Sequence, residues 1–83
     1  MLIEICTDSV EQSVAAANAG ADRIELCSSL TEGGITPSVG LIHQVCSKVH
    51  IPVHVMIRPR SGDFLYNEEE FETMRLEIGR AHV

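Results

Sequence analysis

Basic residues, cysteines and long apolar runs are all scarce in this 83-residue chain. It has 6 lysine and arginine residues against 12 acidic ones, which gives a net charge of −6. Domains that bind nucleic acid carry a basic footprint, so this balance argues against nucleic acid as a partner. No apolar run approaches the roughly 20 residues that cross a bilayer. We therefore expect no nucleic-acid partner and no membrane-spanning segment.

Only three cysteines are present, at positions 6, 27 and 46. The number is odd and the spacings are unlike those of a disulfide framework. The first residues show neither a basic region nor a small-residue cleavage site, so we expect no secretory signal. Reduced thiols in the cytoplasm are the expected state. The hydrophobic content of 45% and the charged content of 22% are typical of a globular domain.

Several catalytic and nucleotide-binding motifs are also missing. Gly33 and Gly34 lack the spacing of a P-loop or a dinucleotide fingerprint. The chain has no Gly-x-Ser-x-Gly elbow, which argues against that group of hydrolases. His43, His50 and His54 do not form the His-Glu-x-x-His arrangement of a zinc protease.

Alternating strand and helix patterns run along the chain. The strand candidates alternate apolar and polar residues, and the helix candidates repeat apolar residues at intervals of three and four. Strands that alternate with helices of 10–12 residues predict βαβ crossovers and a parallel sheet. We place strands at residues 2–6, 23–27 and 51–58, and helices at residues 9–19, 38–49 and from 68 onward.

The predicted helices have recognisable ends. Asp8, Thr36 and Asn67 are the predicted N-caps. Pro37 would then occupy the first helical position, where its missing N–H costs nothing. Gly20 is suited to the left-handed conformation that ends the first helix.

Each strand candidate has one apolar face and one polar face. An open sheet with helices on both sides would bury the polar face at a cost of several kcal/mol for each unpaired charge. A closed (β/α)-barrel gathers the same groups in its interior, where they can pair and meet water, so we favour the barrel over the open sheet. The polar-face residues are Glu4, Cys6, Arg23, Glu25, Cys27, His54 and Arg58.

Charged side chains also follow the third strand candidate. Arg58, Arg60 and Asp63 come at or just after its C-terminal end, which is where α/β proteins place their active sites. An ordinary buried strand followed by a polar loop is an equally good interpretation of this stretch.

Four motifs follow one another along the chain. They are Glu-Ile-Cys with Asp-Ser-Val-Glu (4–11), Gly-Ala-Asp-Arg-Ile-Glu-Leu-Cys (20–27), Glu-Gly-Gly with Thr-Pro-Ser (32–38), and Pro-Val-His-Val-Met-Ile-Arg-Pro-Arg with Gly-Asp-Phe (52–64). In this order they resemble the N-terminal part of the CutC copper-homeostasis family.

The resemblance covers residues 2–78 and implies a TIM-type (β/α)8 barrel, a cytoplasmic location and a role in handling Cu(I). Such a barrel needs roughly 250 residues, so we expect a fragment with about the first three βα units. We assign residues 1–78 to this βαβαβα part and residues 79–83 to a tail unlike the family.

The resemblance implies that Cys6 and Cys27 are copper ligands. Soft thiolates select Cu(I). Both residues would end strands that are neighbours, on the polar face, and neighbouring strands lie about 4.8 Å apart. The alternative is that both are simply small buried residues. Cys46 falls within a helix near its apolar stripe, so we expect it to pack rather than bind metal.

An enzyme that acts on a small anionic substrate is the alternative function. Glu4 and Glu25 can serve as acid or base, His54 can move a proton, and Arg58, with Arg60, can hold an anion. These charges can equally well neutralise one another inside a barrel. Fold alone names no reaction, so enzyme activity stays open. The expected partner is a copper ion or a small anion, and the full-length protein is expected to be a homo-oligomer.

Overall fold

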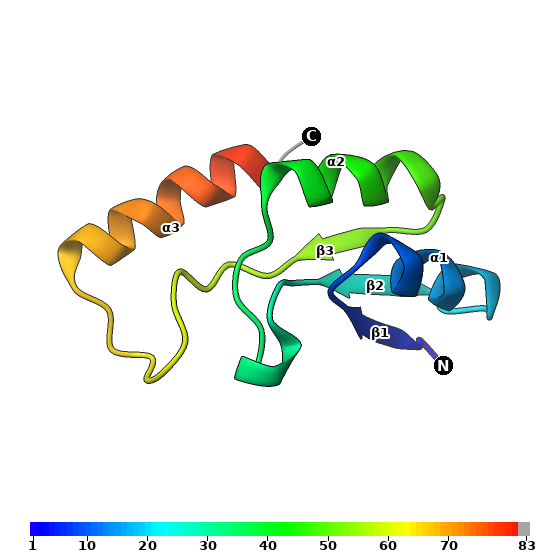
Figure 1. The fold of residues 1–83 in the computed structure, drawn as a ribbon, viewed down its shortest axis with the longest axis horizontal. Coiled ribbons are helices and arrows are strands. Elements are labelled where there is room, and N and C mark those ends of the chain that lie inside the picture. Colours follow the sequence, from blue (N-terminus) through cyan, green and yellow to red (C-terminus); the bar gives the residue numbers. More distant parts are fainter. Residues whose placement is uncertain (82–83) are drawn as a thin grey trace.

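Three parallel strands form a single sheet in the computed structural model, which describes residues 1–81. The strands are β1 (Glu4–Thr7), β2 (Arg23–Leu26) and β3 (Val53–Val55), and their order in the sheet is their order in the chain (Figure 1). Each strand is followed by a helix, so the predicted βαβαβα order is confirmed.

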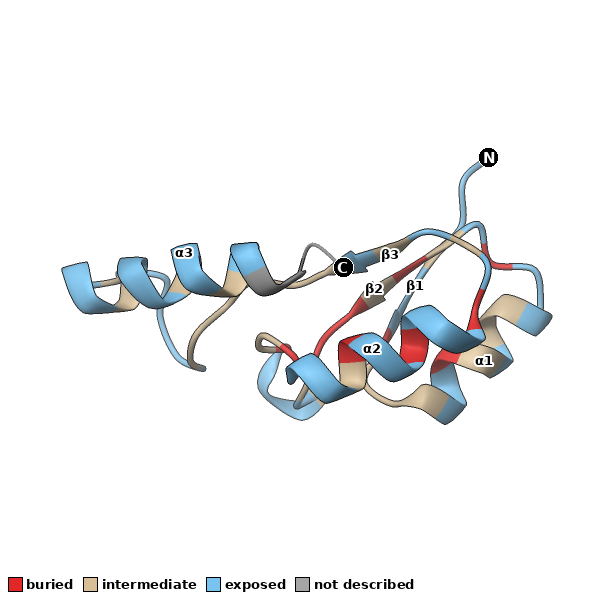
Figure 2. Ribbon diagram, turned by 90° about the horizontal axis from the view of Figure 1, so that it is seen from above, coloured by how far each residue is buried: buried red, intermediate tan, exposed pale blue. Residues whose placement is uncertain are grey.

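The helices are α1 (Val10–Asn18), α2 (Val39–Lys48) and α3 (Glu68–Ala81), with a short 3-10 turn, η1 (Leu30–Glu32), between β2 and α2. Figure 2 shows α1 and α2 covering the same face of the sheet. The third helix extends beyond the sheet, and its C-terminal half approaches the start of α2 (Figure 1). None of the helices in residues 1–81 has the length and apolar character needed to cross a membrane.

The core lies between the sheet and the first two helices. Ile24 and Leu26 point from β2 toward α1 and α2 and are fully buried. Alternation along the strand explains this, because residues two apart share a face. The buried cluster consists of Ile24, Leu26, Ile42, Val45 and Val49.

The third strand is shorter than the predicted residues 51–58. Its ladder ends early because the backbone beyond it bonds elsewhere. The Met56 N–H still donates to the Leu26 carbonyl at 2.9 Å, but the Arg58 carbonyl accepts from the Thr36 N–H at 2.9 Å. The chain therefore turns from the sheet toward the loop between β2 and α2.

Two predicted N-caps are wrong. Helix α1 is capped by Ser9, whose hydroxyl accepts from the Gln12 N–H at 3.1 Å. Asp8 instead accepts from the Leu30 N–H at 3.3 Å and so ties the start of α1 to η1. Ser9, rather than Asp8, has the role of N-cap, with the extended backbone (φ −147°, ψ 161°) that N-cap residues adopt.

The cap of α2 is Ser38, which accepts from the Leu41 N–H at 3.1 Å, so Pro37 precedes the cap. Thr36 connects loops instead: its hydroxyl accepts from the Arg58 N–H at 2.7 Å and donates to Glu77 at 3.1 Å.

The other two helix-end predictions are confirmed. Asn67 and Glu70 form a reciprocal capping box, with N–H to side-chain distances of 2.8 and 2.9 Å. Gly20 follows α1 with a φ of +100°. The third helix continues through residue 81, so the first part of the predicted tail is helical. Residues 82 and 83 lie outside the described residues, and the boundary at residue 78 stays a prediction.

Candidate functional site

The sheet face opposite α1 and α2 collects the polar residues of the strands. The register aligns Cys6 with Glu25, and Glu25 with His54, so these three form one row across the sheet. Cys6 and His54 are exposed, and Glu25 is half-buried. The structure therefore brings Cys6, Glu25 and His54 onto one side, with thiol, carboxylate and imidazole next to one another, whereas Arg58 lies beyond the end of β3.

Glu4 and Arg23 occupy the row below and form an ion pair. Their side chains approach to 2.6 Å, between Glu4 Oε2 and Arg23 Nε. The hydrogen bond from Arg23 holds the pKa of the Glu4 carboxyl below its ordinary value. Glu4 is therefore ionised and neutralised by its neighbour at neutral pH, which makes it a poor general acid.

The two cysteines are staggered rather than directly opposite. Cys6 is the third residue of β1 and faces Glu25, whereas Cys27 follows the last residue of β2. We expected the two cysteines to end their strands directly opposite each other, and this is wrong. The residue opposite Cys6 is Glu25, which lies two residues before Cys27. Residues offset by two on adjacent strands have Cα atoms roughly 7–8 Å apart, so side-chain rotamers decide how closely the sulfurs approach.

Cys27 is fully buried, with 0% of its surface exposed. Its N–H donates to the Thr7 carbonyl at 3.0 Å, and its thiol donates to the same oxygen at 3.6 Å. Gly34 covers the thiol from the β2–α2 loop. A Cβ on Gly34 would lie 3.2 Å from Cys27 Sγ and 2.9 Å from Met56 Sδ, and its φ is +91°. Only glycine fits there without displacing a sulfur atom.

Both thiols are protonated at neutral pH while no metal is bound. Burial raises the pKa of Cys27, and the carboxylates of Asp8 and Glu25 raise it further. The pKa of Cys6 is raised first by its partial removal from water and then by the carboxylates of Glu25 and Glu4. Thiolate is the form that binds metal, so a bound metal would have to displace these protons.

Arg58 joins two loops. Its Nη1 donates to the carbonyls of Glu32 and Gly34 at 3.0 and 2.9 Å, and its Nη2 donates to the Gly62 carbonyl at 2.9 Å. The guanidinium also lies 4.9 Å from the centre of the Phe64 ring. Its Nε is buried and has no hydrogen-bond partner within the described part of the chain. Arg58 thus holds the β2–α2 loop against the β3–α3 loop, and both of its Nη groups already donate to backbone carbonyls.

Arg60 organises the next stretch of the chain. It bonds both oxygens of Glu70 and lies 5.1 Å from the centre of the Tyr66 ring. Its remaining donors go to the Asp63 side chain and to the carbonyls of Ser61, Asp63 and Leu65. Arg60 therefore has no donor left for the anion that the sequence predicted it to hold.

Glu70→Gln is expected to remove part of the protein's sensitivity to acid. The hydrogen bond from Arg60, and then that from the Asn67 N–H, lower the pKa of Glu70. A carboxyl whose pKa is lower in the folded state stabilises the fold above its unfolded pKa of about 4.3. That contribution is lost as the pH falls through the folded pKa. Urea denaturation should therefore show the wild type more stable than Glu70→Gln at pH 7, with the difference shrinking below about pH 4.3.

The matched control is Glu68→Gln, which removes a charge from the same helical turn without touching Arg60. It should leave stability nearly unchanged across this range. A difference between Glu70→Gln and wild type that stays constant from pH 7 to pH 3 would contradict the assignment.

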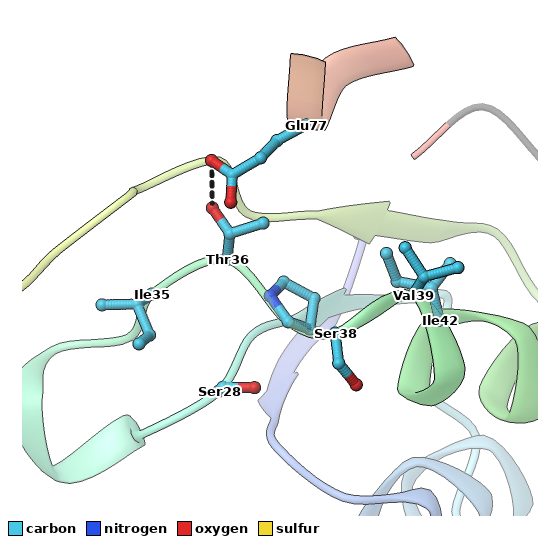
Figure 3. Close-up of a pocket in the computed structure, with 8 residues that line it drawn as sticks. Ser28, Ile35, Thr36, Ser38, Val39, Ile42 and Glu77 are labelled. Carbon is cyan, nitrogen blue, oxygen red and sulfur yellow. Dashed lines mark hydrogen bonds between the residues drawn. The ribbon is translucent and has the colours of Figure 1, made fainter. Parts of the chain in front are cut away.

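An open pocket of about 620 Å³ lies away from the sheet face, between the start of α2 and α3 (Figure 3). Ile35, Val39 and Ile42 give it an apolar lining, and Glu77 closes one side through its bond to Thr36. None of the polar sheet-face residues lines it. The pocket belongs to the outer, helix-bearing side of the molecule.

Within residues 1–81, no three His, Cys, Asp or Glu side chains converge as a metal-binding group. Cys6 and Cys27 therefore lack a third ligand of those types. Met56 was missed by the sequence reasoning about the site, although strand alternation places it on the same face as His54. Cys46 is exposed on α2, away from this face, rather than packed as predicted.

Comparison with known proteins places these features in a family. A model described as the CutC family matches residues 1–83. The copper homeostasis protein cutC homolog of Homo sapiens is 60% identical over 77 residues, which are 93% of this chain and 28% of that protein. A family protein CutC of Vibrio parahaemolyticus is 52% identical over 80 residues, which are 96% of this chain and 32% of that protein. This chain thus spans about a third of these relatives or less.

The crystal structure of a CutC protein from Streptococcus agalactiae superposes with a TM-score of 0.82 and 38% sequence identity. The match covers 98% of this chain and 40% of that one. The chain therefore belongs to the CutC family, and its three βα units are the first part of that family's TIM-type barrel.

Proposed function

We propose that the protein takes part in copper homeostasis in the cytoplasm by binding Cu(I) through Cys6 and Cys27. The observation that carries the proposal is the placement of one thiol on β1 and of the other directly after the adjacent strand β2, on the same face of the sheet. Soft sulfur ligands favour Cu(I) over harder ions. The names of the human and mouse relatives, which refer to copper homeostasis, support the same function.

The position of the thiols in the fold also supports a binding role. Both lie at the C-terminal ends of their strands, where TIM-type barrels place their sites. In a closed barrel this face of the sheet would line the interior, so further βα units would enclose the thiols. A homo-oligomeric full-length protein is part of the same proposal.

Replacing either cysteine by serine is expected to weaken Cu(I) binding by roughly 10- to 100-fold or more, because serine offers a hard oxygen in place of a soft sulfur. The measurement is a Cu(I) titration of the protein under reducing conditions, in competition with a chromogenic chelator. Cys46→Ser is the matched control, since Cys46 is exposed on α2. Affinities unchanged from wild type in both Cys6→Ser and Cys27→Ser would remove the proposal.

An enzyme acting on a small anion has less support from the geometry. Glu4 is paired with Arg23, and the Nη groups of Arg58 bond carbonyls. Glu25 and His54 lie side by side on the sheet face, but neither lines the pocket beside α2, the pocket beside α1 or the pocket at Met56 and Phe64. In residues 1–81 copper binding is therefore the function that the site supports best.

A further inference from the structure

We propose that Met56 supplies a third sulfur ligand to Cu(I), next to Cys27; this rests on the copper site proposed above. The sheet register places the two residues side by side. Leu26 is paired with Val55, and the Met56 N–H donates to the Leu26 carbonyl at 2.9 Å, so Cys27 and Met56 are the next residues on the two strands. Neighbouring strands lie about 4.8 Å apart, which is close enough for one ion to contact both side chains.

The sulfur atoms also converge. Cys27 Sγ lies 3.2 Å, and Met56 Sδ 2.9 Å, from the same point, the position of a Cβ on Gly34. Both sulfur atoms therefore border the same point beside Gly34. Cys6 lies on the same face, one row below Cys27. Cys6 lies within β1, and Cys27 and Met56 lie one residue beyond the ends of β2 and β3.

The chemistry of these donors suits Cu(I) better than other ions. Thioether and thiolate are both soft ligands, and a neutral thioether adds a donor without adding a negative charge. The two thiols already lie near Glu25, Asp8 and Glu4, whose carboxylates disfavour further negative charge. No third His, Cys, Asp or Glu joins them among the described residues. Met56 therefore supplies the third ligand, a sulfur, which no further His, Cys, Asp or Glu among the described residues supplies.

Arg58 holds Gly34 in position over the sulfur atoms of Cys27 and Met56. Its Nη1 donates to the Gly34 carbonyl at 2.9 Å, which fixes the glycine against Met56 and Cys27. This contact gives Arg58 a supporting role at the site, because it holds backbone over the two sulfur atoms.

Met56→Leu is expected to weaken Cu(I) binding by about tenfold while the protein stays folded. The swap nearly conserves volume and usually costs less than about 1.5 kcal/mol of stability. X-ray absorption of the Cu(I)-loaded protein should show three sulfur neighbours in wild type and two in Met56→Leu. Met74→Leu is the matched control, because it removes a methionine from α3 and should change neither reading.

A second measurement uses the wild-type sequence and does not depend on a variant folding. The chain has three methionines, so selective ¹³C labelling of their methyl groups gives three signals. Addition of Cu(I), or of Ag(I) as a redox-inert substitute, should shift the Met56 methyl most and leave that of Met1, which is exposed, in place.

The outcomes separate this inference from the function on which it rests. If Cys6→Ser and Cys27→Ser lose binding while Met56→Leu binds as wild type and its methyl signal is unmoved by metal, the role of Met56 is overturned and the two-cysteine site stands. If neither cysteine variant loses binding, the copper site itself fails, and Met56 fails with it.

Discussion

Leu26→Ala is expected to destabilise the protein by about 2–5 kcal/mol, the range for truncation of a fully buried leucine. Leu26 lies at the centre of the sheet with 0% of its surface exposed, in the cluster with Ile42 and Val45. Helices α1 and α2 cover this face, and the core between them and the sheet is small, so little of it can close around the lost side chain. Small domains have stabilities of about 5–15 kcal/mol, so the loss is a large fraction of the total.

The measurement is urea denaturation followed by circular dichroism, with Leu65→Ala as the matched control. Leu65 has the same side chain but is 83% exposed, so its truncation should change the free energy of unfolding by no more than about 0.5 kcal/mol. Equal effects of the two substitutions would mean that β2 is not at the centre of the core.

Gly34→Ala is expected to destabilise the protein by at least 1–3 kcal/mol, roughly the cost of holding a residue with a side chain in a left-handed conformation. The φ of Gly34 is +91°, and the new methyl group would collide with Met56 Sδ and Cys27 Sγ. For a domain of this size each kcal/mol lowers the melting temperature by roughly 4–8 °C. The substitution should also displace the sulfurs and so weaken any Cu(I) binding.

Gly40→Ala is the matched control and should have the opposite sign. Gly40 lies in α2, and a Cβ there would meet no atom within 4 Å. Alanine in a helix is more favourable than glycine by roughly 0.5–1 kcal/mol, so the variant should melt at a higher temperature. Thermal denaturation of both variants tests the pair. A stable Gly34→Ala variant would show that the loop does not hold the sulfurs as described.

Local patterns were enough to predict the order of the elements. Alternation identified the three strands, apolar spacing identified the helices, and the Asn67–Glu70 capping box was visible in the sequence because its partners lie three residues apart. The resemblance of four ordered motifs to CutC proteins carried the prediction further, to the family and the barrel.

Contacts between distant segments could not be predicted in the same way. Thr36 resembles an N-cap, but its hydroxyl bonds the Arg58 N–H and Glu77 across two loops. Arg58 and Arg60 resemble anion-binding residues, yet most of their acceptors are backbone carbonyls, which any residue can provide. The pattern of side chains along the sequence does not predict where the backbone carbonyl of a distant loop will lie.

The candidate site was predicted in part. Strand alternation placed Cys6, Glu25 and His54 on one face, but alternation alone does not fix register. The two-residue stagger between Cys6 and Cys27 follows from pairings that only the structure shows. Alternation places Met56 on the same face as His54, but it was not proposed as a ligand, because its contact with Gly34 depends on a loop conformation.

The order of the strands bears on how the chain folds. Each strand pairs with the strand that is nearest in the sequence, but the paired residues are far apart in the chain, as Glu4 with Arg23 and Ile24 with Val53 show. Parallel pairing across such separations is slow to form, and domains acquire structure from the N-terminus while synthesis proceeds at about 5–20 residues per second. The pairing of β1 with β2 can therefore begin on the ribosome before α2 and β3 have been translated.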